Sequence, residues 1–235
     1  MSYTLSDILT EISLDFDFTS DLPPTTSSEY TRRVKLINRY ERKWAQAMGG
    51  KWDTLRLSTT LSTTANVSTV TLPTDLTLNG LLLTETGAIT IGSYEYLLVS
   101  FDQKDNYMAY DRICWISGNP IIGLTLNISP TPDSTMSIEL NYFTTNLAYD
   151  STNVGKAVMT TVTDVTKCPD AQYIIAGVLS DLYKTDENPN LGVDFGAQAR
   201  DALNMMIADQ NSGSYNQFSE IPDMATLEGF PQIGD

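Results

Sequence analysis

The chain has 235 residues, enough for one large or two small domains. Its 14 basic and 29 acidic residues give a formal net charge of −15, which argues against a general nucleic-acid binder, because such proteins use cationic groups to displace counterions from phosphates. No apolar run approaches the length of about 18 residues that spans a bilayer, and the acidic start lacks the basic patch and apolar stretch of a signal peptide. We therefore expect a soluble protein made and kept in a cytoplasm, with Cys114 and Cys168 as buried thiols.

The sequence contains no histidine. This excludes Ser-His-Asp and Cys-His catalysis as well as the ordinary imidazole zinc sites. Carboxylate or lysine chemistry remains open in principle, although most acid–base sites use an imidazole. We therefore predict that the protein is not an enzyme and has no catalytic residue, no cofactor and no metal site.

Charge is distributed unevenly along the chain. Residues 1–31 carry six acids and no base, and from residue 181 to the end ten acids face only Lys184 and Arg200. Between these acidic ends, 8 of the 14 bases fall within residues 32–56. Such asymmetry indicates that different faces of the protein have different electrostatic roles.

Apolar residues at helical spacing predict a bundle of about four helices. A short first helix ends before Pro23-Pro24, and the second and clearest helix lies between an N-cap in residues 25–28 and the Gly49-Gly50 stop. A third helix begins near Pro169, and a fourth covers about residues 195–206. The apolar stripe of the second helix consists of Tyr30, Val34, Ile37, Tyr40, Trp44 and Met48.

Between about residues 55 and 145 the pattern is that of β structure. Apolar and polar residues alternate, and Gly, Pro, Asn and Asp mark turns at short intervals. We expect strands at residues 94–101, 107–117, 122–128 and 136–142, in an antiparallel sandwich or barrel-like region. The fold class is then α+β: a helical bundle with an inserted β region and an extended C-terminal tail. The expected divisions are 1–55 (N-terminal helices of the bundle), 56–148 (β-rich insert), 149–210 (C-terminal helices of the bundle) and 211–235 (tail).

The last 25 residues are rich in Ser, Gly, Pro and acids but keep spaced apolar side chains. Such a segment cannot bury enough apolar surface to fold alone, and we expect it to order against a partner. Its expected anchors are Phe218, Ile221, Met224, Leu227, Phe230 and Ile233.

Three other groups of residues suggest chemistry but have simpler explanations. The acids of DFDFTSD (residues 15–21) lack the glycine and the bidentate glutamate of an EF-hand loop. Asp102, Asp105 and Asp111 could supply a carboxylate pair, yet beside an expected β-turn they are best explained as solvated acids. Gly49-Gly50-Lys51 lacks the spacing of a phosphate-binding loop.

The tryptophans and the basic second helix leave alternatives open. Trp44 belongs to the apolar stripe and is expected in the core, whereas Trp52 and Trp115 could lie in a core or on a surface that stacks sugars or bases. The basic helix could contact DNA phosphates or neutralise the acidic surface of a neighbouring copy. The net charge of −15 favours neutralisation.

Residues 30–56, YTRRVKLINRYERKWAQAMGGKWDTLR, resemble the leading helices of bacteriophage head-to-tail adaptor proteins. The turn Leu72-Pro73-Thr74-Asp75 resembles one in the β inserts of such proteins. Residues 173–183 and 195–207, together with the long tail, resemble their closing helices and portal-docking extension. The resemblance covers the whole order of elements.

The resemblance implies a structural virion protein of the neck, at the head–tail interface, that is assembled in the host bacterial cytoplasm. Its copies would form a ring, typically of twelve, attached below the portal protein and carrying tail or nozzle proteins. Viral DNA would pass through the channel without sequence-specific binding, and no membrane would be involved. The subunit or portal interface would then include Arg32, Arg33, Lys35, Arg39, Arg42 and Lys43, and the acids would line or rim the channel.

Two other functions remain as alternatives. One is a tail or fibre-associated β module that binds a carbohydrate or protein receptor through its Thr/Ser-rich region. The other is a carboxylate-based hydrolase.

Overall fold

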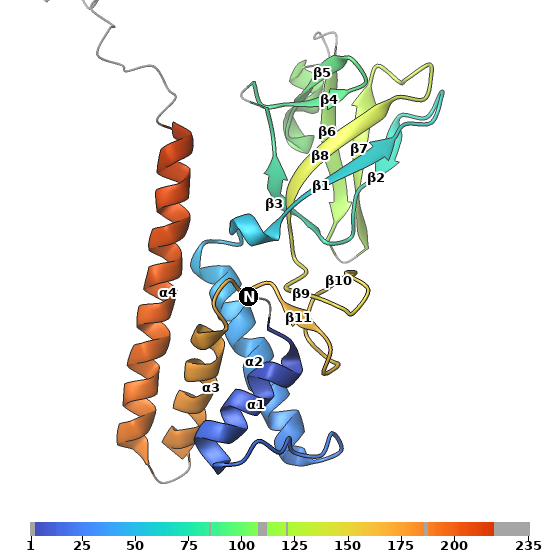
Figure 1. Ribbon diagram of the computed structural model, residues 1–235. Coiled ribbons are helices and arrows are strands. Elements are labelled where there is room, and N and C mark those ends of the chain that lie inside the picture. The colour runs from blue at the N-terminus through green and yellow to red at the C-terminus, as the bar shows by residue number, and fades with distance from the viewer. Residues whose placement is uncertain (1–2, 85, 108–111, 121, 186–187, 219–235) are drawn as a thin grey trace, which may run out of the picture.

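The computed structural model describes residues 3–84, 86–107, 112–120, 122–185 and 188–218. The chain forms a bundle of four α-helices with a barrel-like sheet at one end of it (Figure 1). The expected fold class, α+β with a barrel-like region, is confirmed. Within the described ranges, no helix is both long and apolar enough to cross a membrane. The helices are α1 (Leu5–Asp17), α2 (Ser28–Ala47), α3 (Ala171–Thr185) and α4 (Pro189–Phe218).

The first two helices begin and end where the sequence supplies caps. At the start of α1, the Asp7 N–H donates to Thr4 Oγ1 (3.1 Å) and the Thr4 N–H donates to the Asp7 carboxylate (2.8 Å), which is a capping box. At the start of α2, Ser27 Oγ accepts from the Tyr30 N–H at 3.0 Å. Gly49, just beyond α2, has a φ of 61°, in the left-handed region that glycine adopts without strain. The expected cap and stop of the second helix are therefore confirmed.

The barrel-like sheet has eight strands in the order β1-β8-β4-β5-β6-β7-β2, with β3 also paired to β8. Its pairs are antiparallel except β5 and β6, which run parallel with Leu97 opposite Ile113. The expectation of a wholly antiparallel region is wrong at this pair, because a parallel pair needs a crossover, and the 3-10 helix η2 (Phe101–Tyr107) lies within that connection. The strand expected from residue 107 accordingly begins at residue 113. The bounds are β1 (Arg56–Ser62), β2 (Thr69–Thr71), β3 (Leu76–Leu82), β4 (Ala88–Ile91), β5 (Tyr94–Leu98), β6 (Ile113–Asn119), β7 (Gly123–Ser129) and β8 (Ser137–Thr144).

The bundle and the barrel have separate hydrophobic cores. The bundle core is centred on α3, most of whose side chains are buried and which packs against each of the other three helices. Gly177 brings α3 close to α2, since a Cβ at this position would lie 2.3 Å from Tyr40 Cε1. The barrel core is a second cluster that contains Ile91, Leu126 and Ile138, each fully or almost fully buried. The two bodies therefore do not depend on one shared core.

The chain enters and leaves the barrel at neighbouring positions. The 3-10 helix η1 (Asp53–Leu55) leads into β1, and Arg56 at the start of β1 pairs with Phe143 near the end of β8. Partner Cα atoms in an antiparallel pair lie about 5 Å apart. Both connections between bundle and barrel are thus side by side (Figure 1).

Residues 148–166 form a small sheet against the bundle instead of a helix. Its strands are β9 (Ala148–Tyr149), β10 (Gly155–Lys156) and β11 (Val165–Thr166), in the order β10-β9-β11. Asp164 organises this segment: its buried carboxylate accepts from Lys156 Nζ at 2.5 Å and from the backbone N–H groups of Thr160 and Thr161 at 2.6 and 2.8 Å. Burial alone would raise the pKa of Asp164, but these hydrogen bonds outweigh it and hold the pKa well below its usual range.

The last helix is longer than expected. Residues 211–218 continue α4, so the extended tail does not begin at residue 211. The reason is that the helix propagates from turns anchored on α3, which offsets the weak helix propensity of residues 211–214. Residues 219–235 lie outside the described residues, and with them five of the six expected tail anchors.

Glu41 is a carboxyl group inside the bundle. Its side chain is fully buried, and neither oxygen forms a hydrogen bond of normal geometry with a described residue. Burial raises the pKa of Glu41 to about 7, and the nearby Asp164 carboxylate adds to the shift. The group is therefore protonated in the folded protein under mildly acidic conditions.

We expect Glu41 to make the bundle less stable as pH rises. Its folded pKa of about 7 exceeds the ordinary value of 4.5, so the favourable protonation is complete below pH 4.5 and is lost as pH rises through 7. Over that range the difference corresponds to about 3 kcal/mol. Urea unfolding at pH 5 and pH 8 should show E41Q close to the native protein at pH 5 and more stable than it at pH 8. Equal stability of the two proteins at pH 8 would contradict the raised pKa of Glu41.

The separate cores predict that the bundle folds without the barrel. Replacing residues 57–142 by a four-residue Gly-Ser linker joins two positions that are already neighbours, so the helices should keep their packing. Circular dichroism should show the helical signal of α1 to α4 and a cooperative thermal transition. Loss of helicity in this variant would mean that the two bodies share one folding unit.

Candidate interaction surfaces

Arg33 is the one base of the expected interface that lies inside the subunit. Its side chain is 1% exposed and pairs with the carboxylates of Asp17, at 2.6 Å, and Glu29. The second terminal nitrogen of Arg33, Nη1, donates to Ser13 Oγ at 2.8 Å, and the guanidinium lies over the ring of Phe16. Arg33 thus joins α2 to α1 within the subunit, because its position on the helix turns it toward the core, unlike the exposed position expected of an interface residue.

The other five expected bases of α2 are exposed. Arg39 pairs with Asp181 on α3 at 3.3 Å, and Arg32 donates to the Thr185 hydroxyl at 2.6 Å. Lys43 lies over the ring of Tyr40, 4.1 Å from its centroid. Lys35 and Arg42 form no ion pair with any residue in the described part of the chain. Together Arg32, Lys35, Arg39, Arg42 and Lys43 make the outer side of α2 a positively charged surface.

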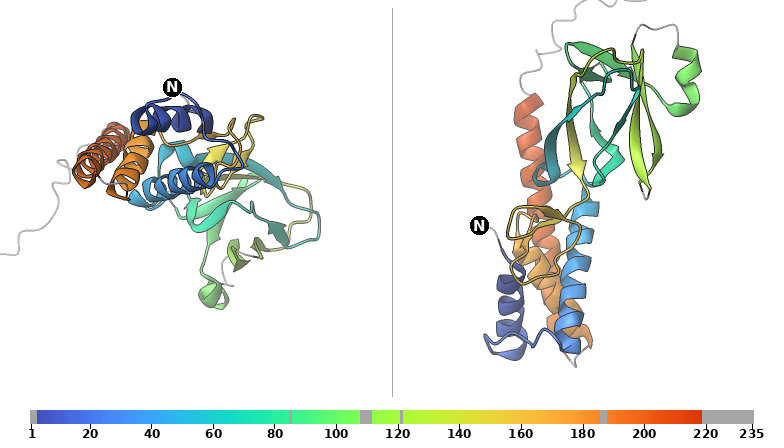
Figure 2. Two further views of the ribbon diagram at one scale, coloured as in Figure 1. Left: turned by 90° about the horizontal axis from the view of Figure 1, so that it is seen from below. Right: turned by 90° about the vertical axis from the view of Figure 1, so that its right-hand side faces the viewer.

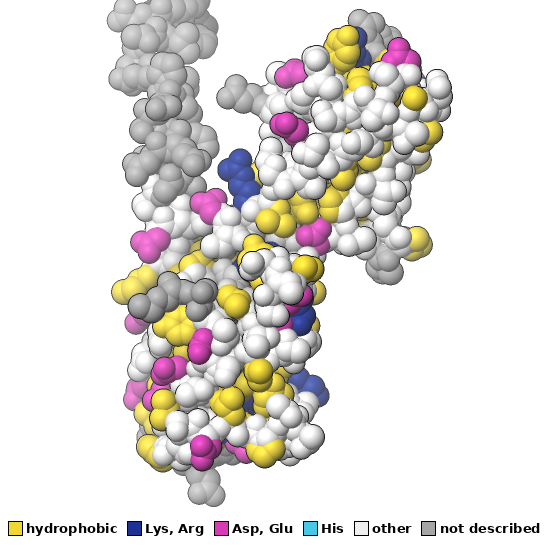
Figure 3. Space-filling view, turned by 45° about the vertical axis from the view of Figure 1, so that its right-hand side comes forward, with side chains coloured by type: hydrophobic (Ala, Val, Ile, Leu, Met, Phe, Trp, Pro, Cys, Tyr) yellow, Lys and Arg dark blue, Asp and Glu magenta, His cyan; other side chains and the backbone are white. Residues whose placement is uncertain are grey.

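The charge of the folded bundle is segregated as the sequence indicated. In the space-filling view, acidic side chains gather over the bundle, whereas bases stand at one edge and near its junction with the barrel (Figure 3). Most acids of α1 and α4 are exposed, including Glu11, Asp194 and Asp201. The molecule therefore presents surfaces of opposite sign on different helices.

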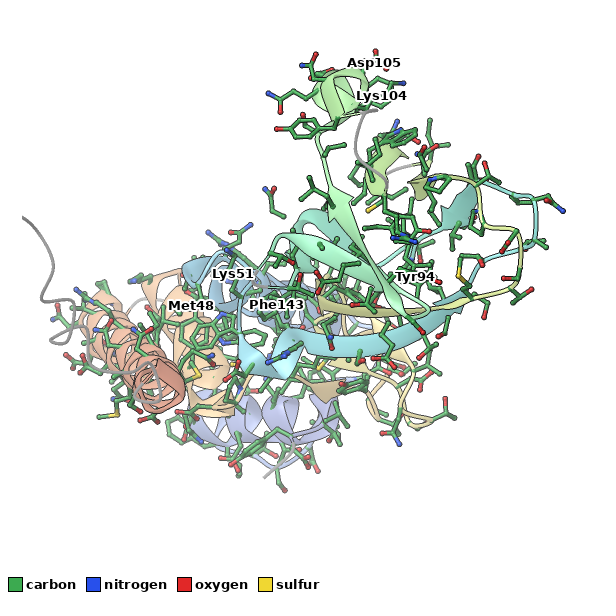
Figure 4. All side chains as sticks on the ribbon, turned by 90° about the horizontal axis from the view of Figure 1, so that it is seen from above. Met48, Lys51, Tyr94, Lys104, Asp105 and Phe143 are labelled. Atoms are coloured by element: carbon green, nitrogen blue, oxygen red, sulfur yellow. The ribbon has the colours of Figure 1, made fainter. Side chains whose placement is uncertain are left out.

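A groove of about 490 Å³ lies where the bundle meets the barrel. Phe143, Leu147 and Leu55 supply apolar walls, and Arg42 and Lys51 are the charged residues that line it. Figure 4 shows Lys51 and Phe143 close together between the helices and the sheet. The sequence did not indicate this groove, because its residues come from the end of α2, from β3 and from the end of β8.

Asp75 fixes the joint beside this groove. Its carboxylate accepts from the Thr144 hydroxyl at 2.6 Å, the Tyr142 hydroxyl at 3.1 Å and the Asn146 amide at 3.3 Å. Its backbone carbonyl accepts from the Thr145 N–H at 2.8 Å. Asp75 closes the turn that the sequence comparison with adaptors singled out, and it ties that turn to the segment that leads from β8 back to the bundle.

The far end of the barrel carries an exposed aromatic group. Phe101 on η2 is 52% exposed, and Lys104 Nζ lies 4.5 Å from its ring centroid and 5.5 Å from that of Trp115. The helix η2, labelled by Lys104 and Asp105 in Figure 4, projects away from the rest of the sheet. This end combines cationic and aromatic groups on a surface that does not contact the bundle.

The other residues considered as catalytic, stacking or metal-binding candidates lie in the core, on the surface or in an ion pair, apart from Asp111. Trp44 and Trp52 contact each other in the bundle core with their rings tilted by 34° and their centroids 5.4 Å apart, and the Trp52 indole donates to the Trp44 carbonyl at 2.9 Å. Asp102 and Asp105 lie on the exposed η2, Asp111 lies outside the described residues, and Asp17 pairs with Arg33. Across the described residues, no three Asp, Glu, Cys or His side chains gather as metal ligands would.

Both cysteines are free and buried, as expected. Burial raises the pKa of Cys114 to about 12 and raises that of Cys168 even further above its ordinary range. Neither thiol is therefore available as a thiolate nucleophile at neutral pH.

The described residues thus form a helical bundle with segregated charge, joined to a barrel with its own core. The chain belongs to the SU10 adaptor protein family, whose model matches residues 3–219. The expected kinship with phage adaptor proteins is confirmed at the level of the family. No curated protein matches the sequence.

We expect Arg33 to contribute strongly to the stability of the fold and the exposed bases of α2 to contribute little to it. In the double variant D17N/E29Q, Arg33 keeps its buried charge without a carboxylate, which should destabilise the protein by about 3 kcal/mol. The matched exposed change K35E should shift stability by less than about 0.5 kcal/mol. Chemical unfolding of the three proteins checks this, and equal stability of D17N/E29Q and the native protein would contradict it.

Proposed function

We propose that the chain is the repeating subunit of a head-to-tail adaptor ring, attached below the portal of the phage head, where it extends the DNA channel and carries the tail. Membership of a phage adaptor family gives the class of function. The observation that most supports the specific role is the division of the subunit into two bodies with separate cores and adjacent connections. Such a subunit can form a ring with one body and offer the other as a platform.

The bundle is the proposed ring-forming body. Its helices carry exposed surfaces of opposite charge, which copies of a chain with net charge −15 need in order to pack side by side. Its exposed acids suit a channel through which DNA moves, since negative surfaces do not retain phosphates. The exposed bases of α2 are too few to offset these acids.

The barrel is the proposed platform for tail or nozzle proteins. The aromatic group at its far end, with Phe101 half exposed beside Lys104, is the kind of surface that partners bury at the centre of an interface. The polar joint around Asp75 would hold this surface at a set angle to the bundle. In this role the protein performs no chemistry.

The C-terminal tail is proposed to dock on the portal through Ile221, Met224, Leu227, Phe230 and Ile233, together with Phe218, the last residue of α4. It begins where α4 ends, and its apolar residues alternate with acids and prolines at spacings that favour ordering on a partner. The family match also stops at residue 219, so this role rests on the sequence of the tail itself.

We expect deletion of residues 219–235 to leave a folded protein that no longer joins portals. The deletion removes none of the described residues that form either core, and on this basis we expect the thermal midpoint to be unchanged. Portal protein from the same phage, mixed with the truncated chain, should appear undecorated by electron microscopy. A chain with the same tail residues in scrambled order is the control for charge and length and should also fail.

Full decoration of portals by the truncated chain would show that the tail is not the docking element. Failure of the native protein to bind portals would contradict the proposed function itself. A receptor-binding fibre module, the alternative function, would leave portals bare and bind cells or glycans through the barrel.

A further inference from the structure

The exposed side of α2 carries a row of bases, and only some of them contact other residues of the subunit. Arg32, Lys35, Arg39 and Arg42 recur about once per turn, and we call them the basic row. Arg39 stays 57% exposed despite its pair with Asp181. The four bases line one open groove along the helix, together with the half-buried Leu36. The row thus combines Lys35 and Arg42, which form no ion pair with a described residue, with the partly exposed apolar side chain of Leu36.

The outer side of α4 has the complementary character. This helix packs against α3, which separates it from α1 and α2 when the bundle is viewed along its axis (Figure 2). Its opposite side exposes Asp194, Asp201 and Asp209, about two turns apart, which we call the acidic row. Met205, 68% exposed, lies among them. The acidic row therefore offers charge of the opposite sign around an apolar side chain.

Much of α4 extends beyond its support. The helix has 30 residues, whereas α3 has 15, and after Met206 and Ile207, which still pack against the bundle core, α4 continues past the end of α3 (Figure 1). In this last part, the N–H of Asp53 on η1 donates to Gln210 Oε1 at 3.3 Å. Because helices in proteins owe most of their stability to packing, we expect the end of α4 to pack against a further surface.

The two rows overlap in height at Arg39, Arg42 and Asp194. Arg39 contacts Asp181, and the adjoining Ser180 donates to the Gly192 carbonyl at 2.7 Å, which places Arg39 near the height of Asp194. Arg42 lies about 4.5 Å further along α2, whereas Asp201 lies about 10.5 Å further along α4, so Arg42 is closer in height to Asp194 than to Asp201. Both helices start at the same end of the bundle and run in the same direction (Figure 1).

We infer that neighbouring copies dock with α2 of one copy lying parallel to α4 of the next, so that Arg39 and Arg42 of the basic row meet Asp194 at the start of the acidic row. This inference deepens the proposed function, on which it rests, by naming the contact that builds the ring. The rows lie on different helices, so the contact is head-to-tail and repeats around a closed ring. Arg42 faces Asp194 in this arrangement.

The test is a charge exchange in the full chain, read out as the fraction of portals that carry a complete ring. Four variants are compared with the native protein: R42E, D194R, R42E/D194R and R42E/E11R. Each single reversal places like charges at every interface and should reduce ring formation by roughly tenfold. R42E/D194R restores opposite charges and should recover rings, whereas R42E/E11R, which reverses an exposed acid on α1 instead, should not. All three substituted positions are exposed, and equal thermal midpoints verify that the subunits are folded.

Recovery by D194R but not by E11R establishes the α2–α4 contact. Recovery by E11R alone would assign the complement to α1 and overturn the inference, as would normal rings from R42E or failure of D194R to rescue it. In each of these cases native rings on portals leave the proposed function standing. Native protein that never joins portals would remove both.

Discussion

Copies of a chain with net charge −15 repel one another, and contacts in which its few bases meet acids relieve that repulsion. The fold already uses three of these bases internally: Arg33 neutralises Asp17 and Glu29, Lys156 neutralises the buried Asp164, and Arg39 pairs with Asp181. The bases left exposed on α2 are then the main positive surface of the bundle. Electrostatics therefore limits the orientations in which subunits can approach one another, before any detailed shape matching.

The second constraint is the way the barrel is attached. It has its own core, so its position relative to the bundle depends on two adjacent connections, and the hydrogen bonds of Asp75 hold one of these, the segment that leaves β8, to the barrel. Polar joints of this kind set an angle because each hydrogen bond has a preferred geometry. In a ring, every barrel would then project at the same angle, and their far ends would form a regular surface for the next protein.

Much of the fold could be predicted from local sequence. The apolar stripe of α2, its Ser27 cap and the Gly49 stop are encoded within a few residues, so the helix was found with its boundaries. The β region was recognised from alternation, but its pairing was not, because the parallel β5–β6 pair and the central place of β8 depend on contacts far apart in sequence. The length of α4 was missed because its support comes from α3, not from the propensity of its own last residues.

The candidate surfaces were predictable to a similar degree. Charge clustering singled out the bases of α2, but only the fold shows that Arg33 turns inward to Asp17 while Lys35 and Arg42 turn outward. Glu29, four residues before Arg33, was the one local signal of that ion pair. The acidic row of α4 could not be found from sequence, because it depends on where this long helix ends. The groove beside Phe143 could not be found either, because residues from three separate elements line it.

The most direct test of the account is an electron cryomicroscopy reconstruction of the native protein bound to the portal of its own phage. The account predicts a closed ring in which the bundles touch one another, with the barrels directed away from the portal. A map showing isolated subunits on the portal, or a ring held together through the barrels with the bundles apart, would contradict it.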